Sequence, residues 1–360
     1  MRKKLLLIAP RISDIYKDII TLLNKWCIDV DFIEDKVSNY DPKYLRSNRN
    51  LLFRNKIGRR IYSSIQKKKW INLLQKEPYN KKYDYLLVIN GQSIHPFLIE
   101  ELRRRNDKLY ASNFLFDTCV SLYQFQYNFP YFDCVASFDK HESAQFNLSF
   151  LPIYWQEEKA CSDFEYDLFC FGGYGPQRLA LYQQIGEIAK QENLQAFIKL
   201  FVPVISHYKL YKIKHRIRKI LGLRTYMPPE HYELGIITHQ RIPANEFRKM
   251  VCNSSIVVDD VKQEQDGMTA RFMWALGAGK KIVTTNTNIL RYECYTPDQI
   301  YVVKDEKALI KDKGLRSFIR KDFKMPPDMR NKIMQWRLDN WLSFLLDIND
   351  HAYKKTNEIE

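Results

Sequence analysis

The segment from Asp266 to Asn286 combines residue types that bind phosphate with a pattern that would position them. It reads as a polar turn, a short amphipathic helix from about Thr269, a Gly-Ala-Gly stop and a β-branched strand. The N-terminus of a helix presents unpaired backbone N–H groups and the positive end of a dipole. Thr269 adds a hydroxyl there, and Arg271 adds a guanidinium that can fork onto phosphate oxygens. The segment therefore predicts a phosphate site, and the alternative is an ordinary helix–strand connection.

Other polar residues of the second half follow the expected strands. In open parallel sheets, ligands bind beyond the carboxyl ends of the strands, so residues at these positions are candidate ligand contacts. They include Gly172, Gly173, Tyr174, Arg178, Lys199, His239 with Gln240 and Arg241, Asp259, Asp260 and the loop from Gln263 to Arg271. Glycines admit close backbone approach, and basic side chains neutralise a diphosphate. Because this half contains two such strand–turn–helix units, the sequence favours a nucleotide diphosphate site.

Two residues of the first half are candidates for acid–base catalysis. His95 lies between the third expected strand and the next helix, where it can act as a base, bind an anion or simply start the helix. Asp117 follows the fourth expected strand, so its carboxylate is expected at the rim of the sheet. It can take a proton from an attacking hydroxyl, and the alternative is an N-cap for the following helix. Asp139 and Glu142 fit a helix start better than a second acid–base pair.

The elements that must position these residues alternate regularly along the chain. In the first half, strands are expected at 5–9, 30–33, 85–89, 109–114 and 134–137, and helices at 15–26, 50–75, 96–105 and 140–147. The alternation pauses near 151–167. It resumes with strands at 167–171, 196–201, 234–238, 256–259, 281–285 and 300–303, and an amphipathic helix follows at about 328–347. This rhythm predicts an α/β protein with two doubly wound parallel sheets.

Size and cysteine content limit the class of protein. At 360 residues, the chain exceeds what one hydrophobic core usually serves, so two domains are expected. The apolar run after the basic N-terminus is too short for a signal peptide and lacks a small-residue cleavage site, which predicts a cytoplasmic protein. Seven cysteines form no C-x-x-C pair, which argues against a disulfide framework and against a zinc site.

The net charge of +15 is concentrated in two basic segments, 43–82 and 209–224. Thirteen Lys and Arg face two acids between residues 41 and 82, and seven face none between 208 and 224. Segregated charge predicts an anionic partner. Apolar residues at 53, 57, 61 and 65 mark one helix face, which either packs in the core or lies on an anionic membrane. Nucleic acid is a weaker alternative, because no recognised nucleic-acid motif occurs.

Four blocks of sequence occur in a characteristic order. They are Leu-Phe-Asp-Thr at 115–118, Phe-Asp-Cys-Val-Ala-Ser-Phe-Asp at 132–139 with Phe-Leu-Pro-Ile-Tyr at 150–154, Tyr-Asp-Leu-Phe-Cys-Phe-Gly-Gly at 166–173 with Arg178, and 265–271 with 280–286. With these blocks, the chain resembles bacterial glycosyltransferases of the GT-B fold that build lipopolysaccharide or capsule. The resemblance covers most of the chain, and the last block is its most specific part.

The resemblance implies two Rossmann-like domains that face a central cleft. Residues 1–152 would bind the acceptor, 153–327 the nucleotide-sugar, and 328–360 would form a helix that crosses back to the first domain, followed by a tail. Donor contacts are then expected from Gly172, Gly173, Arg178, Lys199, Gln265, Gly267, Thr269 and Arg271. Such enzymes need neither a catalytic metal nor a cofactor.

The expected reaction is transfer of a sugar from a nucleotide donor to a lipid-linked or surface-polysaccharide acceptor. Arg178, Arg271 and the helix N-terminus at Thr269 would stabilise the departing diphosphate. Asp117 would be the general base of an inverting enzyme, and His95 is a second catalytic candidate. The basic segments would hold the protein on the inner face of the cytoplasmic membrane. A nucleotide-sugar epimerase on the same scaffold is the main alternative, because fold does not dictate chemistry.

Overall fold

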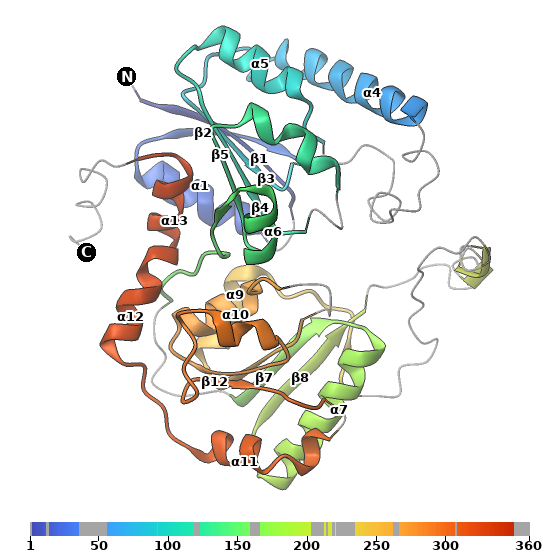
Figure 1. The fold of residues 1–360 in the computed structure, drawn as a ribbon, viewed down its shortest axis with the longest axis vertical. Helices are drawn as coiled ribbons and strands as arrows, with labels where there is room; N and C mark the ends of the chain where they lie inside the picture. Colours follow the sequence, from blue (N-terminus) through green and yellow to red (C-terminus); the bar gives the residue numbers. More distant parts are fainter. Residues whose placement is uncertain are drawn as a thin grey trace. The chain divides into compact units, whose positions relative to one another are not determined.

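The computed structural model (Figure 1) describes most of the chain. The described residues are 2–11, 14–35, 56–91, 93–118, 123–158, 166–202, 212–213, 215–217, 220, 235–261, 266–306 and 308–348. They fold into two compact units. Unit 1 comprises Met1–Pro152 with Leu338–Glu360, and unit 2 comprises Ile153–Arg337. The second boundary therefore falls inside the C-terminal helix expected at 328–347, and not before it.

Unit 1 contains a parallel sheet of six described strands in the order β2-β1-β3-β4-β5-β6. Its strands are β1 Lys4–Ala9, β2 Asp29–Glu34, β3 Tyr85–Ile89, β4 Tyr110–Leu115, β5 Cys134–Ser137 and β6 Ser149–Phe150. Its helices are α1 Ile15–Lys25, α4 Lys56–Leu74, α5 Pro96–Arg105, η1 Tyr123–Tyr131, α6 Lys140–Phe146 and α13 Leu338–Leu345. The central strands β1 and β3 are apolar along most of their length because helices cover both faces of the sheet.

The helix α4 packs on the sheet through a face that the sequence pattern did not predict. Gln66, Trp70 and Leu74 are buried at intervals of four, whereas Ile65 is 45% exposed. The interpretation of Ile65 as part of a core-packed face is therefore wrong. The other positions of that expected face, 53, 57 and 61, lie outside the residues whose side chains are described. Trp70 fixes the helix further, because its Nε1 donates to the carbonyl of Ser93 over 2.7 Å.

The C-terminal helix returns to unit 1, as expected, but it is not continuous. The chain forms α12 (Pro327–Ile333), the short 3₁₀ turn η4 (Met334–Trp336) and then α13. The break coincides with an extended Arg337, which forms a bridge to Trp155. In unit 1, the Trp341 ring packs edge-on against Phe114 at 4.8 Å, and α13 covers the sheet face opposite α4 and α5 (Figure 1).

Unit 2 repeats the architecture, with six described parallel strands in the order β12-β11-β10-β7-β8-β9. Its strands are β7 Tyr166–Gly173, β8 Ala196–Phe201, β9 Ile237–Thr238, β10 Ser254–Asp259, β11 Lys281–Thr284 and β12 Ile300–Val302. Besides α12 and η4, its helical elements are α7 Pro176–Gln191, α9 Ala244–Cys252, α10 Ala270–Gly277, η2 Thr287–Arg291, η3 Leu309–Lys311 and α11 Lys313–Arg320. Two parallel six-stranded sheets with helices confirm the predicted fold class.

The Gly-Ala-Gly stop after α10 has a clear physical cause. A Cβ atom on Gly277 would lie 2.5 Å from Cδ2 of the buried Trp155 indole, so only glycine fits at the end of this helix. Gly279 has φ of +68°, a conformation that favours glycine, and it ends the helix. The chain then enters β11 directly, as the sequence predicted. These contacts fix the C-terminal end of α10 against Trp155, directly before β11 begins.

Candidate functional site

The strand order of unit 2 contains a switch point between β7 and β10. From β7 the chain moves outward to β8 and β9 on one side, and then crosses to β10, β11 and β12 on the other side. In open parallel sheets, such a point leaves a crevice at the carboxyl ends of the two central strands. Here these ends carry the turn after β7, the last residue of β10, Asp259, and Asp260, which follows it.

A cavity of about 130 Å³ lies at this switch point. It is lined by Tyr174, Gly175, Pro176, Gln177, Arg178, Leu181, Asp260, Val261, Thr285 and Glu306. Pockets that enclose a whole ligand usually measure roughly 300–1,000 Å³, so this one holds a group of a ligand and not all of it. The lining comes from the turn after β7, the start of α7 and the ends of β10 and β11.

Arg271 is bonded inward and has no donor left for a ligand. Its Nε donates to Asp259 Oδ1 over 3.2 Å. Its Nη1 donates to the Phe171 carbonyl and to the Tyr182 hydroxyl, and its Nη2 donates to the Asp260 carbonyl and to Asp260 Oδ1. These bonds use all five N–H groups of the guanidinium, which is only 10% exposed. Arg271 thus positions β7, β10 and α7 relative to one another.

The charges of this network support one another. Burial opposes the charge of Arg271, but Tyr182, Asp260 and Asp259 raise its pKa above the ordinary value. Burial alone would raise the pKa of Asp260, but Arg271 and Arg178 lower it below its ordinary value. Both groups are therefore ionised at neutral pH. Asp259 is held on its other side as well, because Thr284 Oγ1 donates to its Oδ2 over 3.1 Å.

Arg178 is the cation of this network that reaches the cavity. Its Nε donates to Asp260 Oδ2 and its Nη1 to the Gly173 carbonyl. Its side chain is 20% exposed, and no described residue accepts a hydrogen bond from its Nη2. A Cβ atom on Gly172 would lie 3.0 Å from the Arg178 side chain, so glycine there makes room for the guanidinium. Arg178 can therefore donate to a ligand from a fixed position.

The open helix N-terminus at the cavity belongs to α7 and not to α10. Gly175 caps α7 without any side-chain hydrogen bond, and Pro176 occupies the first turn. The backbone N–H groups at the start of α7 thus lie against the cavity, which Gly175–Arg178 line. In contrast, Thr269 Oγ1 caps α10 by accepting from Phe272 N over 3.1 Å. The same hydroxyl donates to Asp259 Oδ1 over 2.6 Å, so it is occupied.

The other expected donor contacts lie apart from this cavity. Lys199 sits within β8, two residues before its end, and its Nζ donates to the Gly235 carbonyl over 2.6 Å. Gly267 is buried near Asn286, whose Nδ2 lies 3.4 Å from its carbonyl. Gln265 lies outside the described residues. The structure therefore brings Arg178 and the turn after Gly172 and Gly173 to the cavity, but not Lys199, Gly267 or Thr269.

Glu306 is a cavity residue that the sequence did not reveal. It follows β12, and burial together with the Asp260 charge raises the pKa of its carboxyl. The sequence shows only an acid among charged neighbours after a strand, which is a common pattern. A carboxylate accepts hydrogen bonds and can therefore bind a ligand hydroxyl.

In unit 1, the strand order changes direction between β1 and β3. Asp117 follows β4 and therefore lies at the edge of this sheet that the carboxyl ends of the strands form. Asn90 follows β3 with φ of +64°, and Gly91 follows with φ of +81°. The Asn90 Nδ2 donates to Asp117 Oδ2 over 3.0 Å, while its Oδ1 accepts from Phe116 N over 3.0 Å. The amide thus clamps the half-buried Asp117 carboxylate between the ends of β3 and β4.

His95 is the N-cap of α5. Its Nδ1 accepts from the backbone N–H of Phe97 over 3.1 Å, so the ring is neutral and its proton sits on Nε2. Nε2 lies 3.0 Å from Ser63 Oγ and donates to it in this tautomer. Burial, followed by the charge of Lys67, lowers the pKa of His95. The arrangement leaves no ring lone pair for general-base catalysis.

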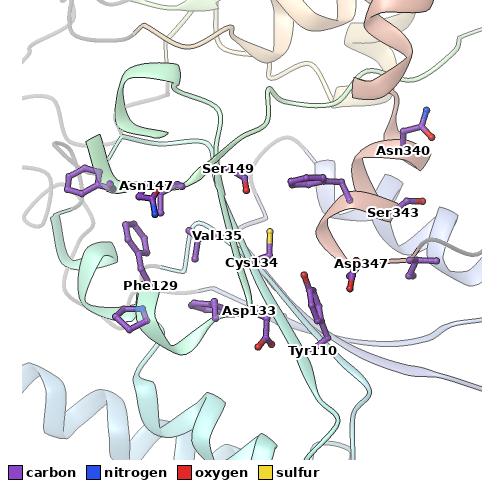
Figure 2. Close-up of a pocket in the computed structure, with 16 residues that line it drawn as sticks. Tyr110, Phe129, Asp133, Cys134, Val135, Asn147, Ser149, Asn340, Ser343 and Asp347 are labelled. Carbon is purple, nitrogen blue, oxygen red and sulfur yellow. The ribbon is translucent and has the colours of Figure 1, made fainter. Parts of the chain in front are cut away.

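A larger cavity of about 980 Å³ lies at the opposite, amino-terminal edge of the unit 1 sheet. Figure 2 shows Tyr110 and Cys134 at the starts of β4 and β5, with Asp347 facing them from the end of α13. Burial raises the pKa of Cys134 to about 11, so its thiol is not a ready nucleophile. The described lining contains Asp133 and Asp347 and no Lys or Arg, which does not suit a diphosphate.

Two further kinds of site are absent from the described residues. No group of three or more His, Cys, Asp and Glu side chains in this part of the chain is placed to hold a metal ion. No helix among the same residues is both long and apolar enough to cross a membrane.

Comparison with known proteins places the fold. No protein-family model matches the sequence, and no curated protein matches it. Among solved structures, the apo structure of OtsA is 14% identical with a TM-score of 0.58, covering 97% of this chain and 99% of that one. The N-terminal domain of trehalose-6-phosphate phosphatase from Candida albicans is 11% identical with a TM-score of 0.53, covering 99% and 97%. At these identities the likeness concerns the fold alone, which is the two-domain GT-B fold.

Proposed function

We propose that the protein is a glycosyltransferase that uses a nucleotide-sugar, whose diphosphate binds at the switch point of unit 2. The observation that carries this proposal is the combination of the open α7 N-terminus with Arg178 at one cavity. Residues 175–178 line that cavity, so both features can donate hydrogen bonds to one anionic group there, as a diphosphate requires. The GT-B fold agrees with such a site, but fold alone does not dictate chemistry, and these groups are what favour a diphosphate ligand.

The buried network below the cavity would make the site rigid. Arg271 holds Asp259 and Asp260, and Asp260 in turn holds Arg178. Since two carboxylates balance two guanidinium groups, attraction for an anion comes from directed N–H groups more than from net charge. Donors that are already oriented cost no reorganisation when charge develops on the departing diphosphate. Glu306 would accept a hydrogen bond from a hydroxyl of the ribose or of the sugar.

The acceptor would bind unit 1, and Asp117 would take the proton from its attacking hydroxyl. Asn90 would hold that carboxylate in place. This role applies to an inverting enzyme, since a retaining one does not need the base. His95 would serve as a helix cap and not as the base. The reaction needs neither a metal nor a cofactor in this proposal.

The acceptor class would be a lipid-linked or surface polysaccharide, such as lipopolysaccharide or capsule. The basic segments 43–82 and 209–224 support a site of action at an anionic membrane surface. The protein would then work on the cytoplasmic face of that membrane.

The proposal is tested by thermal unfolding with UDP, GDP, CDP, CMP and dTDP, followed by product analysis with the matching nucleotide-sugar. A ligand at one hundred times its dissociation constant stabilises a protein by about 2.7 kcal/mol. We expect the nucleotides of one base to raise the unfolding temperature of the protein. The sugar of the matching nucleotide-sugar should then be transferred only when an acceptor is present. Conversion of the donor alone would identify an epimerase. No stabilisation by any of the five compounds would contradict the proposal.

A further inference from the structure

The cavity of about 980 Å³ at the amino-terminal edge of the unit 1 sheet is a second candidate binding site. Its volume falls within the roughly 300–1,000 Å³ that pockets for small molecules usually measure. Its described lining residues all belong to unit 1. Tyr110 lines the cavity from the start of β4, whereas Asp117 follows the other end of the same strand. The cavity is therefore separate from both parts of the proposed transferase site.

One wall of the cavity is a face of α13 and of the turn after it. The helix packs through apolar residues at intervals of three and four, which are Leu338, Trp341, Leu342 and Leu345. Residues with the same spacing on another face line the cavity, and they are Asn340, Ser343, Phe344 and Asp347 (Figure 2). Phe344 is 46% exposed although it is large and apolar. Because Asp347 lies three positions after Phe344, an exposed ring and a carboxylate are neighbours on this wall.

Asp347 occupies a position where local preferences favour an uncharged residue. The helix ends in a Schellman motif, in which Ile348 N donates to the Ser343 carbonyl over 2.9 Å. Asp347 has φ of +50° in this motif, where Gly or Asn is the usual residue. Its carboxylate also meets the negative end of the helix dipole, and no described residue donates a hydrogen bond to it. A cation in the cavity would give the carboxylate the partner that α13 does not provide.

The rest of the described lining adds negative charge and aromatic rings but no Lys or Arg. Asp133 lies in this lining, and its Oδ1 accepts from Arg103 Nη2 over 2.8 Å. Burial, together with the charges of Asp347 and Asp133, raises the pKa of Cys134 to about 11, so both carboxylates act on this part of the cavity. The aromatic rings of the lining are those of Tyr110, Phe129, Phe132, Phe146 and Phe344. The faces of such rings attract cations as well.

We propose that this cavity binds a small organic cation, an amine or a quaternary ammonium with an apolar body, whose charge pairs with Asp347. The apolar body would lie against the aromatic rings, and cation–π attraction would add to the ion pair. Both carboxylates repel an anion, and a neutral sugar would leave the charge of Asp347 unbalanced. The inference goes beyond the proposed function and does not depend on it.

The test is a ligand-detected NMR titration of the full chain at about 0.15 M ionic strength. The three probes share one apolar body and differ in charge at neutral pH: phenethylamine is a cation, phenethyl alcohol is neutral and phenylacetate is an anion. We expect the wild type to bind the amine roughly fivefold more tightly than the alcohol, and phenylacetate most weakly. In Asp347→Asn, the amine and the alcohol should bind equally. Because Asn suits the backbone and removes the unfavourable charge, this variant should unfold at the same temperature as the wild type or at a higher one.

Two further variants locate the site. Asp107→Asn is the matched control, because Asp107 is an exposed acid three residues before Tyr110 and does not line the cavity. It should keep the wild-type preference for the amine. Phe344→Ser removes the exposed ring and should weaken binding of the amine by roughly two- to fivefold.

Four outcomes would overturn the inference. They are equal binding of the amine and the alcohol by the wild type, an unchanged preference in Asp347→Asn, an equal loss in Asp107→Asn, and binding of methyl glucoside without binding of the amine. The third outcome would reduce the effect to the general charge of this edge, and the last would assign the cavity to a glycan. Since the probes contain no nucleotide, each of these outcomes would leave the donor proposal unaffected.

Discussion

The substitution Arg178→Gln separates ligand binding at the switch point from stability of the fold. Arg178 pairs with Asp260 and donates to the Gly173 carbonyl, and among the described residues no acceptor takes its Nη2, which would then donate to the ligand. A hydrogen bond between charged partners contributes about 1.5–3 kcal/mol. Its loss should weaken nucleotide diphosphate binding by roughly ten- to hundredfold. Arg271 still holds Asp260, so we expect a stability loss of only about 1–2 kcal/mol.

The matched control is Arg316→Gln, because Arg316 forms a pair of similar exposure with Glu192 away from the cavity. The side chains of the Arg316–Glu192 pair are 22% and 6% exposed, against 20% and 8% for the Arg178–Asp260 pair. Calorimetric titration with the nucleotide that stabilises the wild type gives the affinity, and thermal unfolding gives the stability. Equal affinities for the two variants would refute the assignment of Arg178 to the donor diphosphate.

Four further changes test other parts of the structure. Arg271→Met leaves two buried carboxylates without their main partner, so denaturant unfolding should show a loss of about 3–5 kcal/mol, and a loss below 1 kcal/mol would contradict the network. Gly277→Ala forces a Cβ into the Trp155 indole and should lower stability by about 1–3 kcal/mol, whereas an unchanged melting temperature would show that the end of α10 yields easily. The pKa of His95 is lower in the folded than in the unfolded chain, so the unfolded chain binds the proton more readily and stability should fall as the pH drops through about 6.5. The variant His95→Asn keeps an N-cap but does not titrate there, so its stability should depend less on pH. Identical pH profiles of stability for the variant and the wild type would contradict the neutral cap. With an identified donor and acceptor, Asp117→Asn should lower kcat by roughly 10²–10⁴-fold with donor affinity unchanged, and near-wild-type turnover would eliminate the base.

The alternation of strands and helices could be predicted because of where the strands lie. Strands such as β1 and β3 are buried on both faces, so they appear as short apolar runs bounded by polar turns. The short turn at Tyr174 and Gly175 and the proline after it also mark the start of α7 directly in the sequence, although Gly172 and Gly173, which were expected in the turn, belong to β7. In these places the local sequence was sufficient to predict the strands and the helix start, because the strands are short and the turn residues directly follow them.

The role of Arg271 could not be predicted in the same way. Its five bonds reach β7, α7 and the end of β10, and the most distant partner, Phe171, lies 100 positions from Arg271 in the sequence. A basic residue at a helix start looks the same whether it faces a ligand or two buried carboxylates. The same limit applies to the choice between α7 and α10 as the open helix N-terminus, since it depends on where the Thr269 hydroxyl is bonded.

The interrupted C-terminal helix is another feature that depends on distant contacts. The apolar pattern from about 328 to 347 continues without a proline or glycine, so nothing local predicts a break. The extended Arg337, the last residue of unit 2, forms a bridge to Trp155, which lies far earlier in the sequence of the same unit. The buried face of α4 was shifted for a similar reason, because Trp70 is fixed by its bond to Ser93.

The most direct measurement for the central claim is amide hydrogen exchange with and without a saturating nucleotide diphosphate. Exchange reports local opening and protection at individual segments. Our account predicts added protection at residues 173–179 and 260–261, around the α7 N-terminus and the end of β10, with no comparable change at the amino-terminal edge of unit 1. Protection confined to unit 1, or to α10 without α7, would contradict it.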